Sequence, residues 1–503
     1  MKIFTYSVLL LLCSIFTVFS CKLPVDDVDT SVEAEIAVPL ADSKTTVKDM
    51  LKGIDSTSVL RFDPDGQVVA QFTTYANSNT TLDPFDGIPN NFVPLLDTAF
   101  AVPFAPPGGL KIGSADFKKG MTNFVVYNNL PEPLTITFRI PQIMKNGVMY
   151  KKTFSLPVGT SAVVDSLDLT GYTMSVVNDE VKVFYDALKN SNNQRVKLVN
   201  VQFAFKNLKG KYVKGYFGVN RFDIPRDSFN IGFIEKLTKG EVKFADPKIT
   251  MTLDNSYGIP VRTSVKTAEV ITADKKRMAL TGTFVSNGVN LNYPSLTETG
   301  AMKSTQIVLD KTNSNIVEIM NSKPTSLVFD IDGVINPDGN KNITGFFTDS
   351  SFFKMKMNIE VPIFGTVKGF EERDTVDFSV PSTNEVDHLE IKVIADNGTA
   401  LDAGLQAYFL DAGNRVIDSL FTTVNPNILK AAPVDATGKV TTAARQITYV
   451  KIDATKLKRL QSAKKTILKY TFSTLNNGLT PIRLYSTQEI RVKLSAIVGV
   501  KRQ

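Results

Sequence analysis

Histidine, cysteine and tryptophan are scarce in this sequence. Its 503 residues include one His, two Cys and no Trp. Catalytic zinc sites and most Cys–His or Ser–His mechanisms need more of these residues. The single histidine, His388, stands in a strand-like stretch, and no Gly-x-Ser-x-Gly elbow accompanies it. We therefore expect a surface or cross-strand histidine, no enzyme activity and no cofactor. A Ser-His-Asp site built on His388 is the alternative.

Long apolar runs are also missing, except near the start of the chain. Residues 8–19 are apolar apart from Ser14 and Thr17, and Lys2 precedes them. This run is shorter than the ~20 residues that span a bilayer. A basic start, a short apolar core and a small residue at the exit predict a secretory signal peptide.

The end of the run, Val18-Phe19-Ser20-Cys21, resembles the bacterial lipobox, whose usual form is Leu-Ala-Gly-Cys. The resemblance implies that residues 1–20 are a lipoprotein signal peptide and that Cys21 becomes a diacylated first residue, which would hold the protein to a membrane. Cys13 would be removed, so no intrachain disulfide could form, and lipidation explains the remaining thiol. The alternative is an ordinary signal peptide cut near Ser20, with Cys21 incidental.

Residues 21–35 are predicted to form an acidic tether, with Asp26, Asp27 and Asp29 close to the anchor. In lipoproteins of the Bacteroidetes, acidic residues shortly after the cysteine resemble a surface-export signal, and a solvated tether is the alternative. We therefore expect a lipid-anchored protein of the bacterial outer membrane, on either its periplasmic or its surface side.

The composition is that of a globular protein, with 43% hydrophobic and 21% charged residues. The length predicts two to four domains. The formal charge of +7 comes from lysines that are scattered among acids. With no arginine stripe or basic helix, we expect no nucleic-acid partner.

Most of the chain after the tether reads as short β-strands, because β-branched and aromatic residues alternate with polar ones between Asn, Gly, Pro and Asp clusters. Short helices are expected at residues 45–51, 179–190, 313–320 and 453–462. The first of these has Thr46 and Asp49 in capping-box positions. Asn146-Gly147 and Asn287-Gly288 predict hairpin turns.

One pattern occurs three times: a strand, a corner that contains Asn, and a second strand. The copies are residues 124–138, 249–263 and 389–403. Asn tolerates left-handed backbone and bonds its own main chain, so it suits a change of direction. Copies at intervals of roughly 130 residues predict three related β-domains. We place them at 36–238 (an N-terminal β region), 239–380 (a second β-domain with a short helix) and 381–503 (a C-terminal β-sandwich).

The corner is similar to that of immunoglobulin-like domains of the plant water-stress type. The whole chain resembles uncharacterised Bacteroidetes outer-membrane lipoproteins, on residues 167–172, 254–260, 314–316 and 407–421. This resemblance brings no known activity. Together with the patterns above, it implies a mainly β fold of several antiparallel sandwich-like domains with a few short helices.

Residues 327–335, Leu-Val-Phe-Asp-Ile-Asp-Gly-Val-Ile, look like the first motif of the haloacid-dehalogenase phosphatases. In that chemistry Asp330 would be the nucleophile and Asp332 the acid/base, with Mg²⁺ between them at a strand end. The motif should open a parallel α/β fold, whereas the surrounding sequence predicts antiparallel strands. We favour a strand followed by a turn.

The same stretch is rich in oxygen ligands. Asp330, Asp332 and Asp338, with Asn336 and Asn340, are the kinds of side chain that calcium prefers. The spacing lacks the twelve-residue calcium loop and its closing Glu. We favour a cluster of turn residues over a metal site.

Phenylalanine is abundant, at 33 residues. Phe346, Phe347, Phe352 and Phe353 are candidates to line a groove for acyl chains, and filling sandwich cores is the favoured alternative.

The sequence leaves three hypotheses for the function. The first is a non-enzymatic binding or scaffold lipoprotein with a protein or glycan partner. The second is a lipid-binding or lipid-transfer protein with an apolar groove formed by Phe-rich sheets. The third is an enzyme that uses Asp330 and Asp332.

Overall fold

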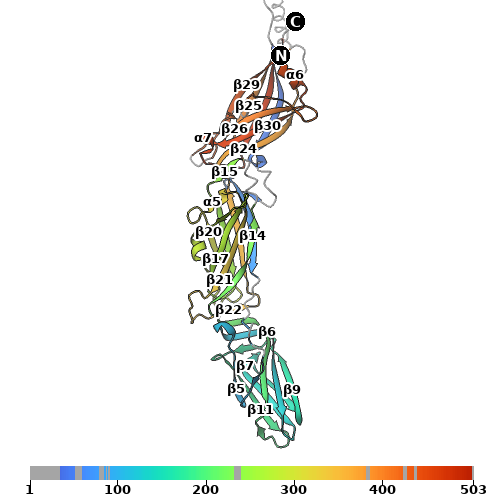
Figure 1. Cartoon of the computed structure of the whole chain (residues 1–503), viewed down its shortest axis with the longest axis vertical. Coiled ribbons are helices and arrows are strands. Elements are labelled where there is room, and N and C mark those ends of the chain that lie inside the picture. Colours follow the sequence, from blue (N-terminus) through green and yellow to red (C-terminus); the bar gives the residue numbers. More distant parts are fainter. Residues whose placement is uncertain are drawn as a thin grey trace, which may run out of the picture.

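The computed structural model describes residues 34–50, 59–78, 84–85, 88, 91–231, 240–380, 386–422, 427–435 and 439–500. The predicted signal peptide, Cys21 and the tether up to residue 33 lie outside these ranges. The fold is mainly β, as predicted, and every strand pairing is antiparallel. The strands form three modules that lie end to end along a rod, which we name base, middle and tip (Figure 1).

The base module is a sandwich of two sheets, each built around four main strands. One sheet has the order β1 (Ala34–Thr46), β32 (Glu489–Val500), β25 (Val386–Asn397) and β29 (Ala444–Ile452). The other has β24 (Phe364–Asp377), β30 (Lys465–Thr474), β26 (Leu401–Leu410) and β27 (Val416–Ser419), with β28 (Asn427–Leu429) and β31 (Ile482–Arg483) added. Counted along the chain within the module, the sheets read 1-8-3-6 and 2-7-4-5, which is the strand order of a jelly roll.

The middle module repeats this order. Its first sheet runs β3 (Val68–Ser78), β23 (Phe353–Pro362), β16 (Lys248–Asn255) and β20 (Lys303–Leu309), with β2 (Val59–Phe62) beside β3. Its second sheet runs β14 (Asn220–Asn230), β21 (Pro324–Ile335), β17 (Val261–Thr272) and β18 (Arg277–Ala279), with β19 (Asn290–Leu291) beside β17. The orders are again 1-8-3-6 and 2-7-4-5.

The tip module is a third jelly roll. Its first sheet runs β4 (Val93–Pro94), β13 (Val201–Tyr216), β6 (Lys111–Asn128) and β9 (Gly159–Asp168). Its second sheet runs β5 (Ala99–Pro103), β11 (Glu180–Lys189), β7 (Leu134–Lys145) and β8 (Val148–Leu156). A short strand, β10 (Thr173–Ser175), pairs with both β6 and β7 and so joins the two sheets along one side. β12 (Arg195–Val196) pairs with β11.

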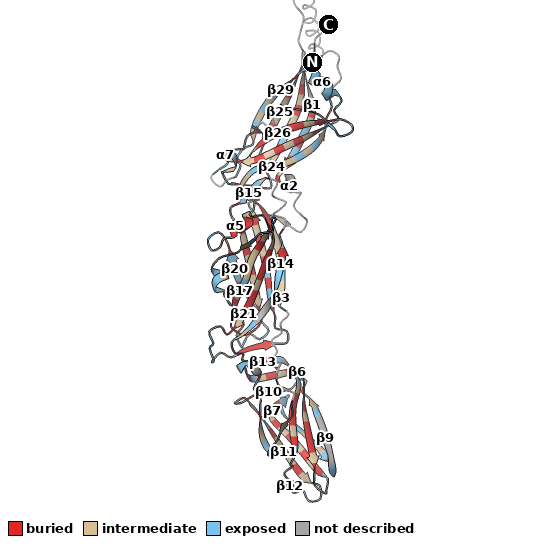
Figure 2. Ribbon diagram, in the orientation of Figure 1, coloured by how far each residue is buried: buried red, intermediate tan, exposed pale blue. Residues whose placement is uncertain are grey.

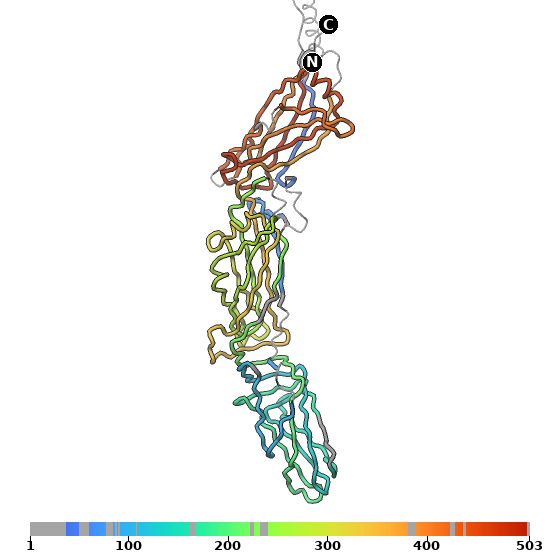
Figure 3. The backbone as a smooth tube through the Cα atoms, viewed as in Figure 1, coloured from blue at the N-terminus to red at the C-terminus, as the bar shows by residue number. Residues whose placement is uncertain are grey.

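The modules are nested in the sequence rather than consecutive. The middle module is inserted between the first two strands of the base, β1 and β24. The tip module is inserted at the same place in the middle module, between β3 and β14. Figure 3 shows the result, because a blue N-terminal strand lies among the orange and red strands of the base. The predicted ranges 36–238, 239–380 and 381–503 differ from this grouping, since they treat each domain as one continuous stretch.

The corner asparagines confirm the predicted repeat. Asn128, Asn255 and Asn397 each end the third strand of a module, and the chain then crosses to the opposite sheet. In each of the three corners, the Asn Oδ1 accepts a hydrogen bond from the backbone N–H of the residue two positions later. The N···Oδ1 distances are 2.9–3.0 Å, and the donors are Leu130, Tyr257 and Thr399. The modules are therefore related, but the jelly-roll order differs from the ABED and CFG sheets of the immunoglobulin fold that the corner suggested.

Three of the four predicted helices are confirmed. They are α2 (Val47–Met50), α5 (Ile316–Asn321) and α6 (Ala454–Gln461). The capping box of α2 forms as expected, because Asp49 N donates to Thr46 Oγ1 at 3.1 Å and Thr46 N donates to Asp49 Oδ2 at 3.0 Å. The described chain also has α4 (Thr283–Asn287), α7 (Leu475–Gly478) and a 3-10 turn, η1 (Pro107–Gly109).

The helix predicted at residues 179–190 is wrong, because this segment is strand β11. Val181, Val183, Tyr185 and Ala187 are buried at every second position, which is the period of a strand facing a core. Of the two predicted hairpin turns, Asn146-Gly147 is confirmed between β7 and β8. Asn287-Gly288 is wrong: Asn287 ends helix α4, and Gly288, at φ 65°, caps it.

Each joint between modules contains a strand that belongs in sequence to the middle module. β15 (Glu241–Phe244) pairs with β24 of the base. Its Phe244 also contacts the middle module, because Phe244 N donates to Asn321 Oδ1 at 2.7 Å and Asn321 Nδ2 donates to Phe244 O at 3.0 Å. β22 (Gly345–Thr348) adds to β13 of the tip, while Phe346 exchanges two main-chain bonds with Gly258 of the middle at 2.9 and 3.1 Å. Each of these two strands is therefore hydrogen-bonded to both modules that meet at its joint.

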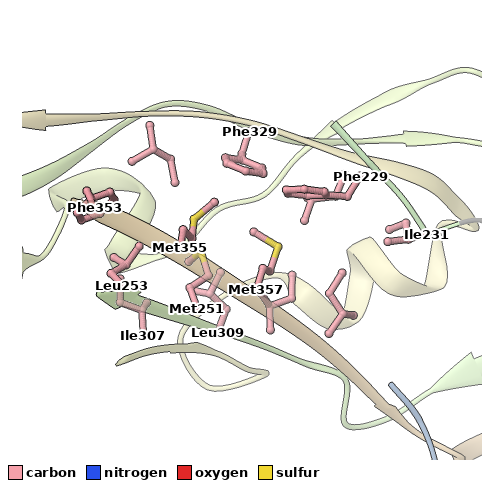
Figure 4. Close-up of a cluster of buried hydrophobic side chains, with 14 of the residues drawn as sticks. Phe229, Ile231, Met251, Leu253, Ile307, Leu309, Phe329, Phe353, Met355 and Met357 are labelled. Atoms are coloured by element: carbon pink, nitrogen blue, oxygen red, sulfur yellow. The ribbon is translucent and has the colours of Figure 1, made fainter. Parts of the chain in front are cut away.

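The apolar core runs along the inside of all three sandwiches (Figure 2). The tip core is built on stacked rings, with Phe124 and Phe138 centroids 3.9 Å apart. The middle core is rich in methionine, where Met251, Met355 and Met357 pack beside the Phe229–Phe329 pair (Figure 4). Methionine is flexible and fills irregular gaps between two sheets.

Candidate functional site

The predicted Asp330 and Asp332 lie on β21, inside an antiparallel sheet between β14 and β17. Asp332 is 1% exposed and carries two ion pairs, with Lys266 Nζ at 2.8 Å and Arg221 Nη1 at 3.7 Å. A phosphatase motif of this type stands at the end of a parallel strand. The observed geometry therefore matches the strand interpretation, and Asp332 is a buried charge held by two cations.

Asp338 and its neighbours form a turn after β21. Asn336, at φ 47°, bonds Asn340 both ways through its amide, at 3.1 Å each. Asp338 is exposed and pairs with Arg262 at 3.2 Å. Asp330, Asp332 and Asp338 do not converge, and among the described residues no three His, Cys, Asp or Glu side chains gather as metal ligands would.

The four candidate phenylalanines do not share a surface. Phe346 and Phe347 belong to β22 and pack in the joint against Tyr212 and Phe217, with ring centroids 5.9 and 5.4 Å apart. Phe353 is buried in the middle core. Phe352 lies at the surface under Lys354 Nζ, 4.3 Å from its ring centre. Three of the four thus fill packed interiors.

His388 lies in strand β25, opposite Gly499 of β32, as the sequence pattern indicated. Cys21 lies outside the described residues. Within the described part of the chain, no helix is long and apolar enough to cross a membrane.

The surface that sequence reasoning missed is at the free end of the tip module. Leu96, Val158 and Val199 are 71%, 53% and 82% exposed. Leu96 and Val199 directly follow the buried residues Leu95 and Leu198, and Val158 stands two residues after the buried Leu156. We call Leu96, Val158 and Val199 the tip ridge. In the sequence, its signal is an apolar residue placed where a loop normally has a polar one.

Two main-chain hydrogen bonds and one from a side-chain amide place the three loops of the ridge side by side. Leu95 N donates to Val201 O at 2.7 Å, and Tyr127 N donates to Asn200 O at 3.2 Å. Asn128 Nδ2 then donates to Pro157 O at 2.8 Å. Since neighbouring strands lie about 4.8 Å apart, the ridge follows the rim of one sheet from β4 across β13 and β6.

Charged side chains border the ridge. Lys197 lies 3.5 Å from Asp97, and Lys189 lies 3.2 Å from Glu132. The backbone N–H of Thr98, together with Lys197, lowers the pKa of Asp97, and the Ser191 hydroxyl lowers the pKa of Glu132. Both carboxylates are therefore ionised at neutral pH. An apolar centre with a polar rim is the usual anatomy of a protein-binding surface.

Comparison with known proteins yields no family. No family model and no curated protein sequence matches this chain. Among solved structures, a protein of Parabacteroides distasonis described as secreted aligns at 11% identity with a TM-score of 0.33, covering 58% of this chain and 89% of its own. A structure of infectious bursal disease virus, Gx strain, aligns at 7% identity with a TM-score of 0.16, over 91% of this chain and 85% of its own. An archaeal virus protein with a triple jelly roll aligns at 11% identity with a TM-score of 0.11, over 85% of this chain and 95% of its own.

Proposed function

We propose that this protein is a lipid-anchored, non-enzymatic scaffold of the bacterial envelope that holds the tip ridge at a distance from the membrane to bind a protein partner. The observation that carries the proposal is the pairing of Ala34 with Val500. It puts both ends of the described chain at the outer end of the base module, and the ridge stands at the opposite end of the rod (Figure 1).

The predicted anchor fits this geometry. Cys21 precedes Ala34 by 13 residues, which span at most about 45 Å when extended. The hydrogen bonds across both joints would help to keep the tip from folding back toward the membrane. An anchored rod of this kind separates attachment at one end from recognition at the other.

The ridge is well suited to a protein partner. Burying one Val or Leu side chain contributes about 1.5–3 kcal/mol, so three of them could supply several kcal/mol of affinity. Aligned on one rim, they fit an apolar cleft in the partner, while the surrounding ion pairs would set its orientation. Three of the four phenylalanines proposed for an acyl-chain groove are packed in interiors, so we favour the scaffold over lipid transfer.

Photo-crosslinking tests the ridge. A photoreactive residue at position 96, 158 or 199 of the full-length protein, in intact cells, should give one discrete adduct with the same protein. Position 75 and position 479 are matched controls, because Tyr75 and Leu479 are also exposed apolar residues (65% and 79%) but lie on other modules. The triple change of Leu96, Val158 and Val199 to Ser should abolish the adduct formed from a fourth tip position, Asn129. Equal crosslinking from control and ridge positions would refute the proposal.

The anchor has a separate test. Full-length protein should take up a labelled fatty acid and partition into detergent, and the Cys21→Ser variant should do neither. Labelling that persists in the Cys21→Ser variant would place the lipid elsewhere and contradict the lipobox interpretation.

A further inference from the structure

The base module ends in a basic surface next to the start of β1. Ile452, just before α6, is paired with Leu389, Leu389 with Val498, and Val498 with Ile36. Two strands, β25 and β32, therefore separate the start of helix α6 from the first residues of β1, and both lie at the same end of the rod (Figure 1).

Two connections form this surface. The turn at residues 411–415 and the segment at residues 453–465 meet where Lys465 Nζ donates to Asn414 Oδ1 at 3.4 Å. The strands that flank the turn also contact this segment, because Lys464 N donates to Leu410 O of β26 at 2.8 Å and Arg459 Nε donates to Asp418 Oδ2 of β27 at 2.6 Å. The exposed basic residues of the two connections form what we call the base patch: Arg415, Lys458, Arg459, Lys464 and Lys465.

Acidic residues at this end lie mostly behind the bases. The side chains of Asp411 and Asp418 are 19% and 14% exposed, whereas those of their partners Arg415 and Arg459 are 84% and 50% exposed. Asp453 is used as the N-cap of α6, where it accepts Lys456 N at 2.8 Å. Two acids are exposed at this end, Asp453 and Asp377, and Asp377 is paired with Lys465 across β24 and β30. Against the five exposed bases of the base patch, the balance of exposed charge among the described residues is still positive.

An apolar side chain accompanies the bases. Val416 follows Arg415 and is 58% exposed at the beginning of β27. Bases around an exposed apolar residue are the composition of surfaces that rest on a membrane interface. A basic patch beside a lipid anchor is a common further contribution to membrane binding.

We propose that the base patch binds anionic lipid headgroups, so that the base module rests on the membrane beside its own anchor. This inference rests on the proposed anchoring, which brings the patch near a lipid surface. Each basic residue near an anionic surface contributes about 1 kcal/mol, and salt screens the attraction. The patch would thereby orient the rod as well as strengthen its attachment.

Vesicle sedimentation tests the patch without the lipid anchor. The probe is the chain from residue 21 with Cys21→Ser, mixed with vesicles of phosphatidylcholine alone or of equal parts phosphatidylcholine and phosphatidylglycerol. We expect binding to the anionic vesicles only, and loss of that binding at high salt. The double variant Lys458→Glu/Lys464→Glu should bind at least about tenfold more weakly.

The matched control is Lys151→Glu/Lys182→Glu, which changes the net charge equally on exposed lysines of the tip module. It should bind like the parent. If both double variants lose binding to the anionic vesicles equally, the effect is one of net charge and the inference is overturned. The inference is also overturned if the parent protein does not bind anionic vesicles. Because the ridge crosslinking uses no vesicles, failure of the patch and failure of the proposed function are told apart.

Discussion

Replacing the corner residue Asn397 by Ala should destabilise the base module strongly. Asn397 is 1% exposed, and its Nδ2 donates to Leu401 O at 2.7 Å and Lys430 O at 2.9 Å. Its Oδ1 accepts from the N–H and the hydroxyl of Thr399 at 2.9 and 2.8 Å. The side chain thus serves both the crossing between the sheets and the segment that precedes β29.

The magnitude follows from what Ala leaves behind. Two carbonyls, one N–H and one hydroxyl lose this partner in a place with little access to water, and each buried group left unsatisfied costs about 1–3 kcal/mol. We expect a loss of about 3–5 kcal/mol in the free energy of unfolding of the base, which is a large share of the stability of a typical domain. Asn255→Ala should cost less in the middle module, because the amide of Asn255 makes a longer contact, 3.2 Å to Asn292 O.

Urea unfolding followed by hydrogen exchange and mass spectrometry measures this module by module. Asn414→Gly is the control, because Asn414 is an exposed turn residue of the same module at φ 60°, which Gly adopts freely. A loss below about 1 kcal/mol for Asn397→Ala, or a larger loss for Asn255→Ala, would refute the view that the buried corner amide holds each sandwich together.

Three further predictions concern single modules and joints. Gly258→Ala should expose β22 to hydrogen exchange and cost about 1–3 kcal/mol, because a Cβ there would stand 2.0 Å from the Phe346 ring; Gly147→Ala, with nothing within 4 Å, should leave β22 protected. Met357→Ala should lower the unfolding free energy of the middle module by about 2–5 kcal/mol and Met357→Leu by less than about 1.5 kcal/mol; equal losses on urea titration would contradict close packing. Burial raises the pKa of Tyr470, so the unfolded state releases this proton first and stability should fall above pH ~10. Tyr470→Phe should reduce that alkaline slope in urea titrations of the base, and an unchanged slope would exclude Tyr470 as its source.

Local patterns in the sequence predicted the building blocks correctly. Alternating apolar residues gave the strands, and the Asn corners gave three related modules, because both depend on residues only a few positions apart. The capping pair Thr46 and Asp49 marked α2 for the same reason. The wrong helix prediction at residues 179–190 shows the limit of such patterns. A short run of mixed apolar and charged residues is compatible with a helix or a strand, and only packing against the core decides that every second side chain is buried.

The candidate site was less accessible to sequence reasoning. Asp330 and Asp332 resemble a catalytic pair as a string, but antiparallel neighbours on both sides determine what the pair can do. The four phenylalanines are close in sequence, yet a joint, a core and a surface divide them. Leu96, Val158 and Val199 are far apart in the sequence and meet only because three loops end on one sheet rim.

The sequence by itself therefore determined the strands, the corners and the number of related modules, because these follow from side-chain alternation and turn chemistry within short windows. Only the tertiary structure decided which strands pair. β1 joins β32 from the other end of the chain, and β15 and β22 leave their own module to extend a neighbour's sheet. The physical reason is that main-chain hydrogen bonds are alike for every strand. Partner and register are therefore selected by the burial of whole faces across long chain separations, which no local pattern records.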